Sequence, residues 1–312
     1  MPDEVRDIVL SEAISADDMI RQMYDAGGFS AKPLAIGVGI LEEMVRDKDC
    51  LTFLSFPANL VATGTRGVLR ELVKRRWVDA VITTCGTLDH DIARTFKPYY
   101  HGDFCMDDGK LRKRGINRLG NVLVPNASYG PIVEEKVGEM LQERGDWEGG
   151  RIGTKELCWE IGKRLDERSI LYWSAHNHIP VYVPGITDGA VGSQLWIWSQ
   201  EHDFQIDVLA DERELADLVF GAKRSGALIL GGGISKHHVI WWNQFKDGLD
   251  YAVYVTTAVE WDGSLSGARL REAVSWGKVK ANARYVTIPG DVTVLLPLMV
   301  AAMLDRLSGK KV

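Results

Sequence analysis

The sequence has few cysteines and lacks the patterns in which they usually act. Its 312 residues include four of them, and no two form a C-x-x-C pair: Cys50, Cys85, Cys105 and Cys158. Such spacing fits neither the disulfide framework of a small secreted domain nor a structural zinc site. We therefore expect reduced thiols that are mostly buried.

Long apolar runs are also missing. Charged residues interrupt every apolar stretch well before the roughly 18 consecutive residues that a membrane span needs. The start of the chain, with Asp3, Glu4 and Asp7, lacks the basic and then apolar order of a signal peptide. These absences predict a soluble cytoplasmic protein.

An excess of positive charge is absent as well. The formal net charge is -6, whereas a nucleic-acid surface usually shows clustered lysine and arginine. The one dense basic run, at 74–76, closes a predicted helix, where it complements the helix dipole. The charge favours a cationic small molecule or a basic protein as partner, and no nucleic acid.

Short β-rich runs alternate with longer amphipathic stretches, which predicts an α/β fold with a mainly parallel sheet and helices on both faces. Predicted strands cover residues 51–56, 78–83, 181–183, 227–230, 251–255 and 285–288, and predicted helices include 64–76, 133–143, 212–223 and 292–307. No repeat or Pro/Gly-rich linker divides the chain, so we expect a single domain over residues 1–312. Residues 1–30 are expected to form a small helical extension capped by Ser15 or Asp17.

The loops after the predicted strands are rich in small residues, and ligands of parallel sheets bind beyond these strand ends. The loops cover residues 57–64, 84–91, 185–189, 231–238, 256–258 and 290–291. Small residues let backbone N–H groups approach a phosphate, and a following helix N-terminus favours the anion. These features favour a nucleotide site. The G-x-G-x-x-G fingerprint is absent, however, and the triple glycine at 231–233 alone more often marks a tight turn.

Two histidine pairs, His176 with His178 and His237 with His238, suggest a metal site. Adjacent helical residues point about 100° apart, so His237 and His238 would not share a ligand face. No H-x-x-x-H motif or cysteine partner accompanies either pair. We therefore predict no metal and an ordinary structural role for His176, His178 and His238.

Lys278 follows Trp276 and Gly277, and a bulky indole beside a glycine can place the amine in a partly desolvated pocket. Burial disfavours the ammonium form, and a neutral amine can attack an imine or carbonyl carbon. The same residues could equally form a packed turn with Lys278 in water. The residues by themselves leave that choice open.

Three stretches of the chain resemble deoxyhypusine synthase. They are G-G-G-I-S-K-H-H at 231–238, D-G-S-L-S-G-A-R at 262–269 and E-A-V-S-W-G-K at 272–278. Further matches occur at 114–118, 120–126 and 177–180, and the colinear similarity covers roughly residues 35–305. Convergence would hardly produce so many matches in one order, so the sequence is identified as a member of this family.

The resemblance implies a Rossmann-like NAD-binding fold and a homotetramer with active sites between paired subunits. It also implies transfer of an aminobutyl group from spermidine to a lysine of the translation initiation factor 5A precursor, through an imine on Lys278. By this resemblance NAD would be held by Asn59, Thr84, Cys85, Gly86, Asp188, Gly232, Thr257, Ala258 and Asp291. The polyamine would be held by Asp89, His237, Gly263, Ser264, Glu272 and Trp276.

These implied roles make chemical sense. NAD would oxidise the carbon beside the secondary amine of spermidine, which no side chain alone can do. His237 would bind that amine or accept its proton, because a histidine titrates near neutral pH. Asp89 and Glu272 would hold the ammonium ends, and Trp276 would offer its ring face to a cation.

The chain departs from the eukaryotic pattern at residues that would contact the amine and the nucleotide. Leu265 and Ser193 stand where the eukaryotic members carry acidic residues, and His90 stands in place of a second acid. Ala58 and Ala62 replace serines of the nucleotide loop. These departures favour an archaeal or other prokaryotic branch with a different set of contacts to the donor amine.

Other functions compete with this interpretation. The nearest is a homospermidine synthase-like transfer to a free diamine such as putrescine, which would use the same site. A sirtuin-like deacylase shares the Rossmann-like core but usually adds a four-cysteine zinc module, which these cysteines are spaced wrongly to form. A non-catalytic NAD-binding or assembly protein would follow if Lys278 were exposed to solvent.

Overall fold

The computed structural model describes residues 3–144 and 150–308. The chain divides into two compact units: unit 1 comprises Met1–Ser55 and Ala216–Val312, and unit 2 comprises Phe56–Leu215. Helix α10 (Val208–Gly221) contains one of the points at which the chain passes from one unit to the other. Organisation as a single domain stays a prediction.

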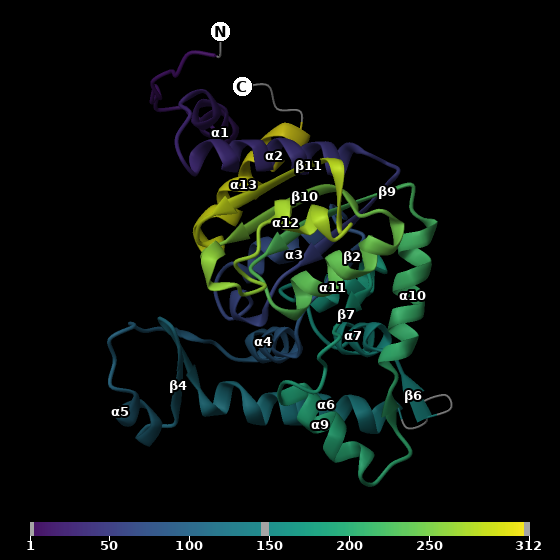
Figure 1. Cartoon of the computed structure of the whole chain (residues 1–312). Coiled ribbons are helices and arrows are strands. Elements are labelled where there is room, and N and C mark those ends of the chain that lie inside the picture. The colour runs from purple at the N-terminus through teal and green to yellow at the C-terminus, as the bar shows by residue number, and fades with distance from the viewer. Residues whose placement is uncertain (1–2, 145–149, 309–312) are drawn as a thin grey trace. The chain divides into compact units, whose positions relative to one another are not determined.

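Unit 1 is built on parallel strands in the order β11-β10-β9-β1 (Figure 1). These strands are β1 (Cys50–Ser55), β9 (Arg224–Leu230), β10 (Leu249–Thr256) and β11 (Val279–Pro289). Residues of β9 and β10 are buried almost without interruption. Their continuous apolar runs are typical of parallel strands that are covered on both faces.

Three helices of unit 1 pack against one another: α1 (Ala16–Asp25), α2 (Ala31–Arg46) and α13 (Val292–Leu307) (Figure 1). Helix α2 also contacts β1, β10 and β11. A glycine permits this close approach, because a Cβ on Gly37 would lie 2.6 Å from Cδ1 of Ile288. Helix α1 begins after Ser15, which forms a capping box with Asp18, so Ser15 is the cap and Asp17 lies within the helix.

Short elements of unit 1 carry the motifs singled out in the sequence. Helix α11 (Ile234–Asn243) follows β9 and contacts β9 and β1, and η4 (Gln244–Lys246) continues it toward β10. After β10 come η5 (Glu260–Asp262) and α12 (Leu270–Ser275), and α12 packs on β11. The three stretches that resemble deoxyhypusine synthase therefore belong to one unit. They are the glycine motif (231–238), the aspartate motif (262–269) and the lysine motif (272–278).

Unit 2 surrounds short strands with helices. Strands β2 (Ala80–Ile82) and β7 (Val181–Tyr182) form a parallel pair, as do β6 (Arg151–Ile152) and β8 (Gln205–Ile206). An antiparallel sheet has the order β3-β5-β4. The remaining elements are η1 (Ala58–Leu60), α3 (Arg66–Lys74), α4 (Cys85–Phe96), β3 (Tyr100–His101), α5 (Asp108–Lys113), β4 (Ile116–Leu119), β5 (Val122–Pro125), η2 (Asn126–Ser128), α6 (Gly130–Arg144), α7 (Thr154–Gly162), α8 (Ile170–Asn177) and α9 (Ala190–Ser199).

The predicted α/β class and the parallel pairing are confirmed. Strand ends were less well predicted: β11 begins at Val279 rather than at residue 285. Strands β3, β4, β5, β6 and β8 had no counterpart in the prediction, because runs of two to four residues are too short to show a pattern. Within the described ranges, no helix is both long enough and apolar enough to cross a membrane.

A buried ion pair connects three helices of unit 2. Arg66 Nε of α3 donates to Asp91 Oδ1 of α4 at 2.6 Å, and both side chains are buried. The other oxygen of Asp91 accepts hydrogen bonds from Ser169 Oγ at 2.7 Å and from the N–H of Leu171 at 2.9 Å, at the start of α8. The guanidinium also donates to Thr95 Oγ1 at 2.6 Å. The interior tolerates both charges because each has hydrogen-bonding partners.

We expect Asp91→Asn to lower the free energy of unfolding by about 3 kcal/mol, because Arg66 would stay buried without its counter-charge. Urea denaturation of wild type and variant measures the difference. The matched control is Asp166→Asn, since the ion pair of Asp166 with Arg168 lies largely in solvent; its effect should stay within about 0.5 kcal/mol. Equally small effects in both variants would contradict the assigned role of Asp91.

Candidate active site

The chain turns sharply from β9 into α11 through three glycines. Gly231 and Gly233 have φ angles of 72° and 82°, in the left-handed region that favours glycine. A Cβ on Gly232 would lie 2.3 Å from Ser266 Oγ, so this glycine permits close contact with the following loop. The three glycines therefore form a tight turn, as the sequence predicted for residues 231–233.

The first turn of α11 leaves polar groups without partners. Its N-cap is Gly233, so no side chain caps the helix. The hydroxyl of Ser235 is buried and has no hydrogen-bond partner among residues 3–144 and 150–308. A Cβ on Gly233 would meet nothing within 4 Å, so the backbone faces open space. A phosphate or hydroxyl of a nucleotide fits such a set of free donors.

A pocket of about 180 Å³ lies beside α11 in unit 1. Its lining includes four residues to which the sequence assigned catalysis or polyamine binding: His237, Glu272, Trp276 and Lys278. Leu265, one of the departures from the eukaryotic pattern, also lines it. The fold thus brings the lysine motif, the glycine motif and the aspartate motif to one cavity.

The side chain of Lys278 is buried in this pocket, at 9% exposure of the residue. Its Nζ lies 5.2 Å from the centroid of the Trp276 ring and 5.7 Å from that of Trp241. Within the part of the chain that the structure describes, the amine has neither a hydrogen-bond acceptor nor a carboxylate partner. The sequence left open whether Lys278 lies in a pocket or points into water. In the structure it lies in a pocket.

His237 is half-buried on α11, and its ring stacks on Trp241 with centroids 5.5 Å apart. Burial and, after it, the positive charge of Lys278 lower the pKa of His237 below its ordinary value of 6.5. The imidazole is therefore mainly neutral at pH 7 and can accept a proton. Burial lowers the pKa of the neighbouring His238 to about 4, so His238 is neutral as well.

Two residues of unit 1 that the sequence assigned to the polyamine, Gly263 and Ser264, do not line the pocket. Gly263 takes a φ of 71° in the turn after η5, and Ser264 is exposed. The N–H of Ser264 donates to Asp262 Oδ1 at 2.7 Å, and its hydroxyl accepts from the N–H of Gly267 at 3.1 Å. Both residues thus shape the loop that carries Leu265. Glu272 is exposed in the first turn of α12.

Lys236 is a buried lysine to which the sequence analysis gave no role. Its Nζ donates to the carbonyl oxygens of Leu265 at 2.7 Å and Ala268 at 2.6 Å, and lies 4.0 Å from the centroid of the Tyr254 ring. Burial lowers its pKa to about 8; the charge of Glu272 opposes this shift, and that of Arg269 adds to it. No sequence signal could reveal this, because the acceptors are backbone groups of a distant loop. Trp241 was missed too, although its spacing of four residues from His237 on a helix was available.

Asp89 of α4 lies in unit 2 and is fully buried. Its carboxylate accepts hydrogen bonds from the N–H groups of Ala190 at 2.9 Å and Val191 at 2.8 Å, at the start of α9, and from the Tyr129 hydroxyl at 2.8 Å. Burial raises the pKa of Asp89, and these hydrogen bonds oppose the rise. Asp89 thus caps α9, and its contact with a polyamine stays a prediction.

The residues assigned to NAD come from both units, and none lines the pocket of Lys278. In unit 2, Thr84 is the N-cap of α4 and accepts from the N–H of Ala58 at 3.1 Å, and burial raises the pKa of Cys85 to about 12. Asn59 and Asp188 are exposed. Asp291 of unit 1 caps α13 by accepting a hydrogen bond from the N–H of Thr293 at 2.7 Å. The remaining residues assigned to NAD are Gly86 in unit 2 and Gly232, Thr257 and Ala258 in unit 1.

A model of one protein family matches nearly the whole chain. Its description is deoxyhypusine synthase, and the match covers residues 18–303. The chain belongs to the deoxyhypusine synthase family. It is therefore an enzyme, a transferase.

Archaeal members of the deoxyhypusine synthase family are similar to the chain over almost its full length. The "Probable deoxyhypusine synthase" of Picrophilus torridus is 54% identical over 310 residues, which are 97% of this chain and 98% of the relative. That of Thermoplasma acidophilum is 53% identical over 306 residues, 96% of this chain and 97% of the relative. These relatives agree with the archaeal branch that the sequence favoured.

A solved structure has the same fold. It is the crystal structure of a candidate deoxyhypusine synthase from Entamoeba histolytica, with a TM-score of 0.64, 19% sequence identity and coverage of 96% of both chains. This likeness places the α/β architecture of the chain within the fold of the deoxyhypusine synthase family.

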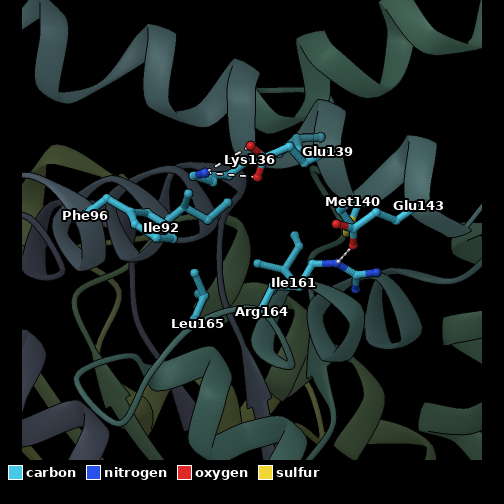
Figure 2. A pocket seen from close by; sticks show the side chains of 10 residues that line it. Ile92, Phe96, Lys136, Glu139, Met140, Glu143, Ile161, Arg164 and Leu165 are labelled. Atoms are coloured by element: carbon cyan, nitrogen blue, oxygen red, sulfur yellow. Dashed lines mark hydrogen bonds and ion pairs between the residues drawn. The ribbon is translucent and has the colours of Figure 1, made fainter.

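A second pocket, of about 280 Å³, lies among α4, α6 and α7 of unit 2 (Figure 2). Ion pairs of Lys136 with Glu139, at 2.9 Å, and of Arg164 with Glu143, at 3.1 Å, border an apolar interior that includes Ile161. None of the residues that the sequence assigned to catalysis, polyamine or NAD lines it. Among the described residues, those assigned to catalysis line the pocket of Lys278 and not this one.

We expect Lys236→Met to lower the free energy of unfolding by about 2 kcal/mol at neutral pH, because the carbonyls of Leu265 and Ala268 lose their donors. The pKa of Lys236 is about 8 in the folded protein against an ordinary 10.5. The unfolded chain therefore binds the proton more tightly, and wild-type stability should rise between these two pH values. The variant should lack this rise.

Urea denaturation at about pH 7.5 and about pH 9.5 measures both effects. Lys223→Met is the control, because Lys223 is exposed and pairs only with Asp49 at the surface of unit 1 among the described residues. A wild-type advantage over Lys236→Met that shrinks as the pH rises would contradict the buried, weakly basic lysine.

Proposed function

We propose that the enzyme transfers an aminobutyl group from spermidine to a lysine of the translation initiation factor 5A precursor, in an NAD-dependent reaction through an imine on Lys278. The observation that carries this proposal is the amine of Lys278, which is buried and unpaired within the described ranges. His237, Glu272 and Trp276 lie in the same pocket. Membership of the deoxyhypusine synthase family supports the same reaction.

When bound, NAD would take a hydride from the donor carbon and return it at the end of the cycle. The resemblance assigns its binding to Asn59, Thr84, Cys85, Gly86, Asp188, Gly232, Thr257, Ala258 and Asp291. The uncapped first turn of α11 and the unpartnered hydroxyl of Ser235 favour such a ligand.

His237 and Lys278 would carry the proton and carbon transfers. Neutral His237 accepts the proton of the secondary amine of the donor. The amine of Lys278 then attacks the imine carbon of the oxidised donor: its new carbon–nitrogen bond forms, the bond to the nitrogen of 1,3-diaminopropane breaks, and the leaving amine takes up a proton. Attack by the acceptor lysine on the imine of Lys278 repeats the exchange and frees the enzyme.

The remaining side chains would hold the donor. Glu272 would pair with an ammonium end and Trp276 would offer its ring face, while Gly263 and Ser264 would shape the adjoining loop. Asp89 is assigned to the polyamine by resemblance, and any such contact competes with its three hydrogen bonds. Leu265 offers no charge to a second ammonium, so the donor contacts differ from the eukaryotic set.

The proposal also covers the acceptor, the oligomeric state and the location of the enzyme. We infer a protein acceptor, a homotetramer with active sites between paired subunits, and a cytoplasmic location. Family membership supports each of these inferences. Transfer to a free diamine such as putrescine is the alternative that the experiment must separate.

Lys278→Ala should reduce transfer by at least about a thousandfold, because the proposed imine forms on this amine. The enzyme is incubated with NAD, spermidine and the factor precursor, and mass spectrometry measures the aminobutyl group added to the precursor. Borohydride should trap the same group on wild-type Lys278. Lys280→Ala is the matched control, because Lys280 lies two residues further along, in β11, and pairs with Asp250 at 2.6 Å.

The acceptor is tested by replacing the precursor with putrescine. Formation of homospermidine together with an unmodified precursor would exclude the protein acceptor. An unmodified precursor and no trapped group on wild-type enzyme would exclude the imine mechanism itself.

His237→Gln should remove the acid limb of the pH profile of kcat/KM. The pKa of His237 is lowered by burial and by Lys278, so in the wild type activity should be lost as the pH falls through a value below 6.5. Initial rates between about pH 5 and about pH 8 measure this limb. An unchanged limb in the variant would assign the titration to another group.

A further inference from the structure

Two indole rings flank the amine of Lys278. Trp276 follows α12, at 5.2 Å from ring centroid to Nζ, and Trp241 lies on α11, at 5.7 Å. A cation within about 6 Å of a ring centroid is attracted by the negative face of the ring. The Trp241 ring also stacks on His237, at 5.5 Å and 27°. One side chain thus contacts both groups to which the proposed reaction assigns chemistry.

No carboxylate pairs with the Lys278 amine in the described part of the chain. The charged or titratable groups that line the pocket with it are Lys236, His237, Arg269 and Glu272. Of these, Lys236 is bonded to two carbonyls, and Glu272 is exposed. Within the described ranges, the two ring faces are therefore the attractive contacts that the nitrogen makes.

We propose that Trp241 is a positioning residue for Lys278: its ring face, with that of Trp276, holds the nitrogen in its cationic forms. These forms are the ammonium before the reaction and the protonated imine during it. The statement about the imine rests on the proposed function. A carboxylate would fix the ammonium in an ion pair and keep it from attacking. A ring face attracts the cation more weakly and lets the nitrogen lose its proton.

A ring face also suits the intermediate better than a carboxylate does. A protonated imine spreads its charge over nitrogen and carbon and keeps one N–H, whereas an ammonium has three. A diffuse cation with few donors loses little when it faces an apolar ring. Because Trp241 lies one helical turn from His237, the same ring orients the proposed base.

The test compares Trp241→Leu with Trp241→Phe and does not need a donor. Acetic anhydride reacts with the neutral amine, and peptide mass spectrometry follows acetylation of Lys278 against pH. In Trp241→Leu the midpoint should fall by about 0.7 pH unit, because a cation–π contact contributes about 1 kcal/mol to the ammonium form. Trp241→Phe keeps a ring face and should shift by less than half of this.

A purely structural role of Trp241 predicts the opposite sign. Loosened packing would admit water, which stabilises the ammonium and raises the midpoint. The matched control is Trp242→Leu, the next residue on α11, which should leave the midpoint unchanged. A rise in Trp241→Leu, or equal shifts in the leucine and phenylalanine variants, would overturn the proposal. If the leucine variant does not fold, Trp241→Met replaces it with the same expected shift.

Steady-state rates with NAD and spermidine give the second measurement. Trp241→Leu should lower kcat about fivefold, with KM for spermidine changed by less than about twofold. A loss confined to KM would assign Trp241 to donor binding and overturn the positioning role. If wild type transfers no aminobutyl group but the acetylation midpoint still depends on the ring, the proposed function fails and the positioning of the Lys278 amine stands.

Discussion

The buried amine of Lys236 fixes the loop on which the pocket of unit 1 depends. It donates to the carbonyls of Leu265 and Ala268, and the carbonyl of Ser266 between them accepts from Tyr254 and from Thr256 Oγ1. Buried carbonyl groups without donors would cost more than these side chains lose in desolvation. Helix α11 and strand β10 thus determine together where the loop leads into α12, and so where Trp276 and Lys278 lie.

Two lysines of the same pocket differ in what surrounds their nitrogens. Lys236 has two carbonyl acceptors and a ring face, so its nitrogen is committed to structure whether it carries two or three protons. The described surroundings of Lys278 offer ring faces but no acceptor. A nucleophile needs a lone pair that no hydrogen bond or ion pair occupies. The contrast therefore distinguishes, by geometry, the lysine that holds the loop from the lysine to which we assign the reaction.

The sequence predicted the parts of this protein that depend on local pattern. Burial on both faces makes β9 and β10 continuous apolar runs, and the small residues after them mark the strand ends. The motif match singled out Lys278 and His237, which the fold brings to one pocket, and their catalytic roles stay a prediction. The structural roles of Lys236 and Asp89 could not be predicted, because their partners lie far along the chain and are mostly backbone groups. Every residue has the same backbone N–H and C=O groups. Hydrogen bonds from a lysine or carboxylate to the backbone therefore cannot be recognised from the residue types.

Leu265 and Trp241 suggest how one pocket can handle amines with little negative charge. The residues assigned to the polyamine in unit 1 include one carboxylate, Glu272, and it is exposed, where water and salt weaken an ion pair. Where the eukaryotic pattern has an acid, Leu265 adds apolar surface. Apolar walls strengthen a cation–π contact because they exclude water from the cation. In the proposed reaction, the loss of an acid at 265 and the presence of an indole at 241 would thus act in the same direction: the donor would be recognised less by paired charges and more by ring faces.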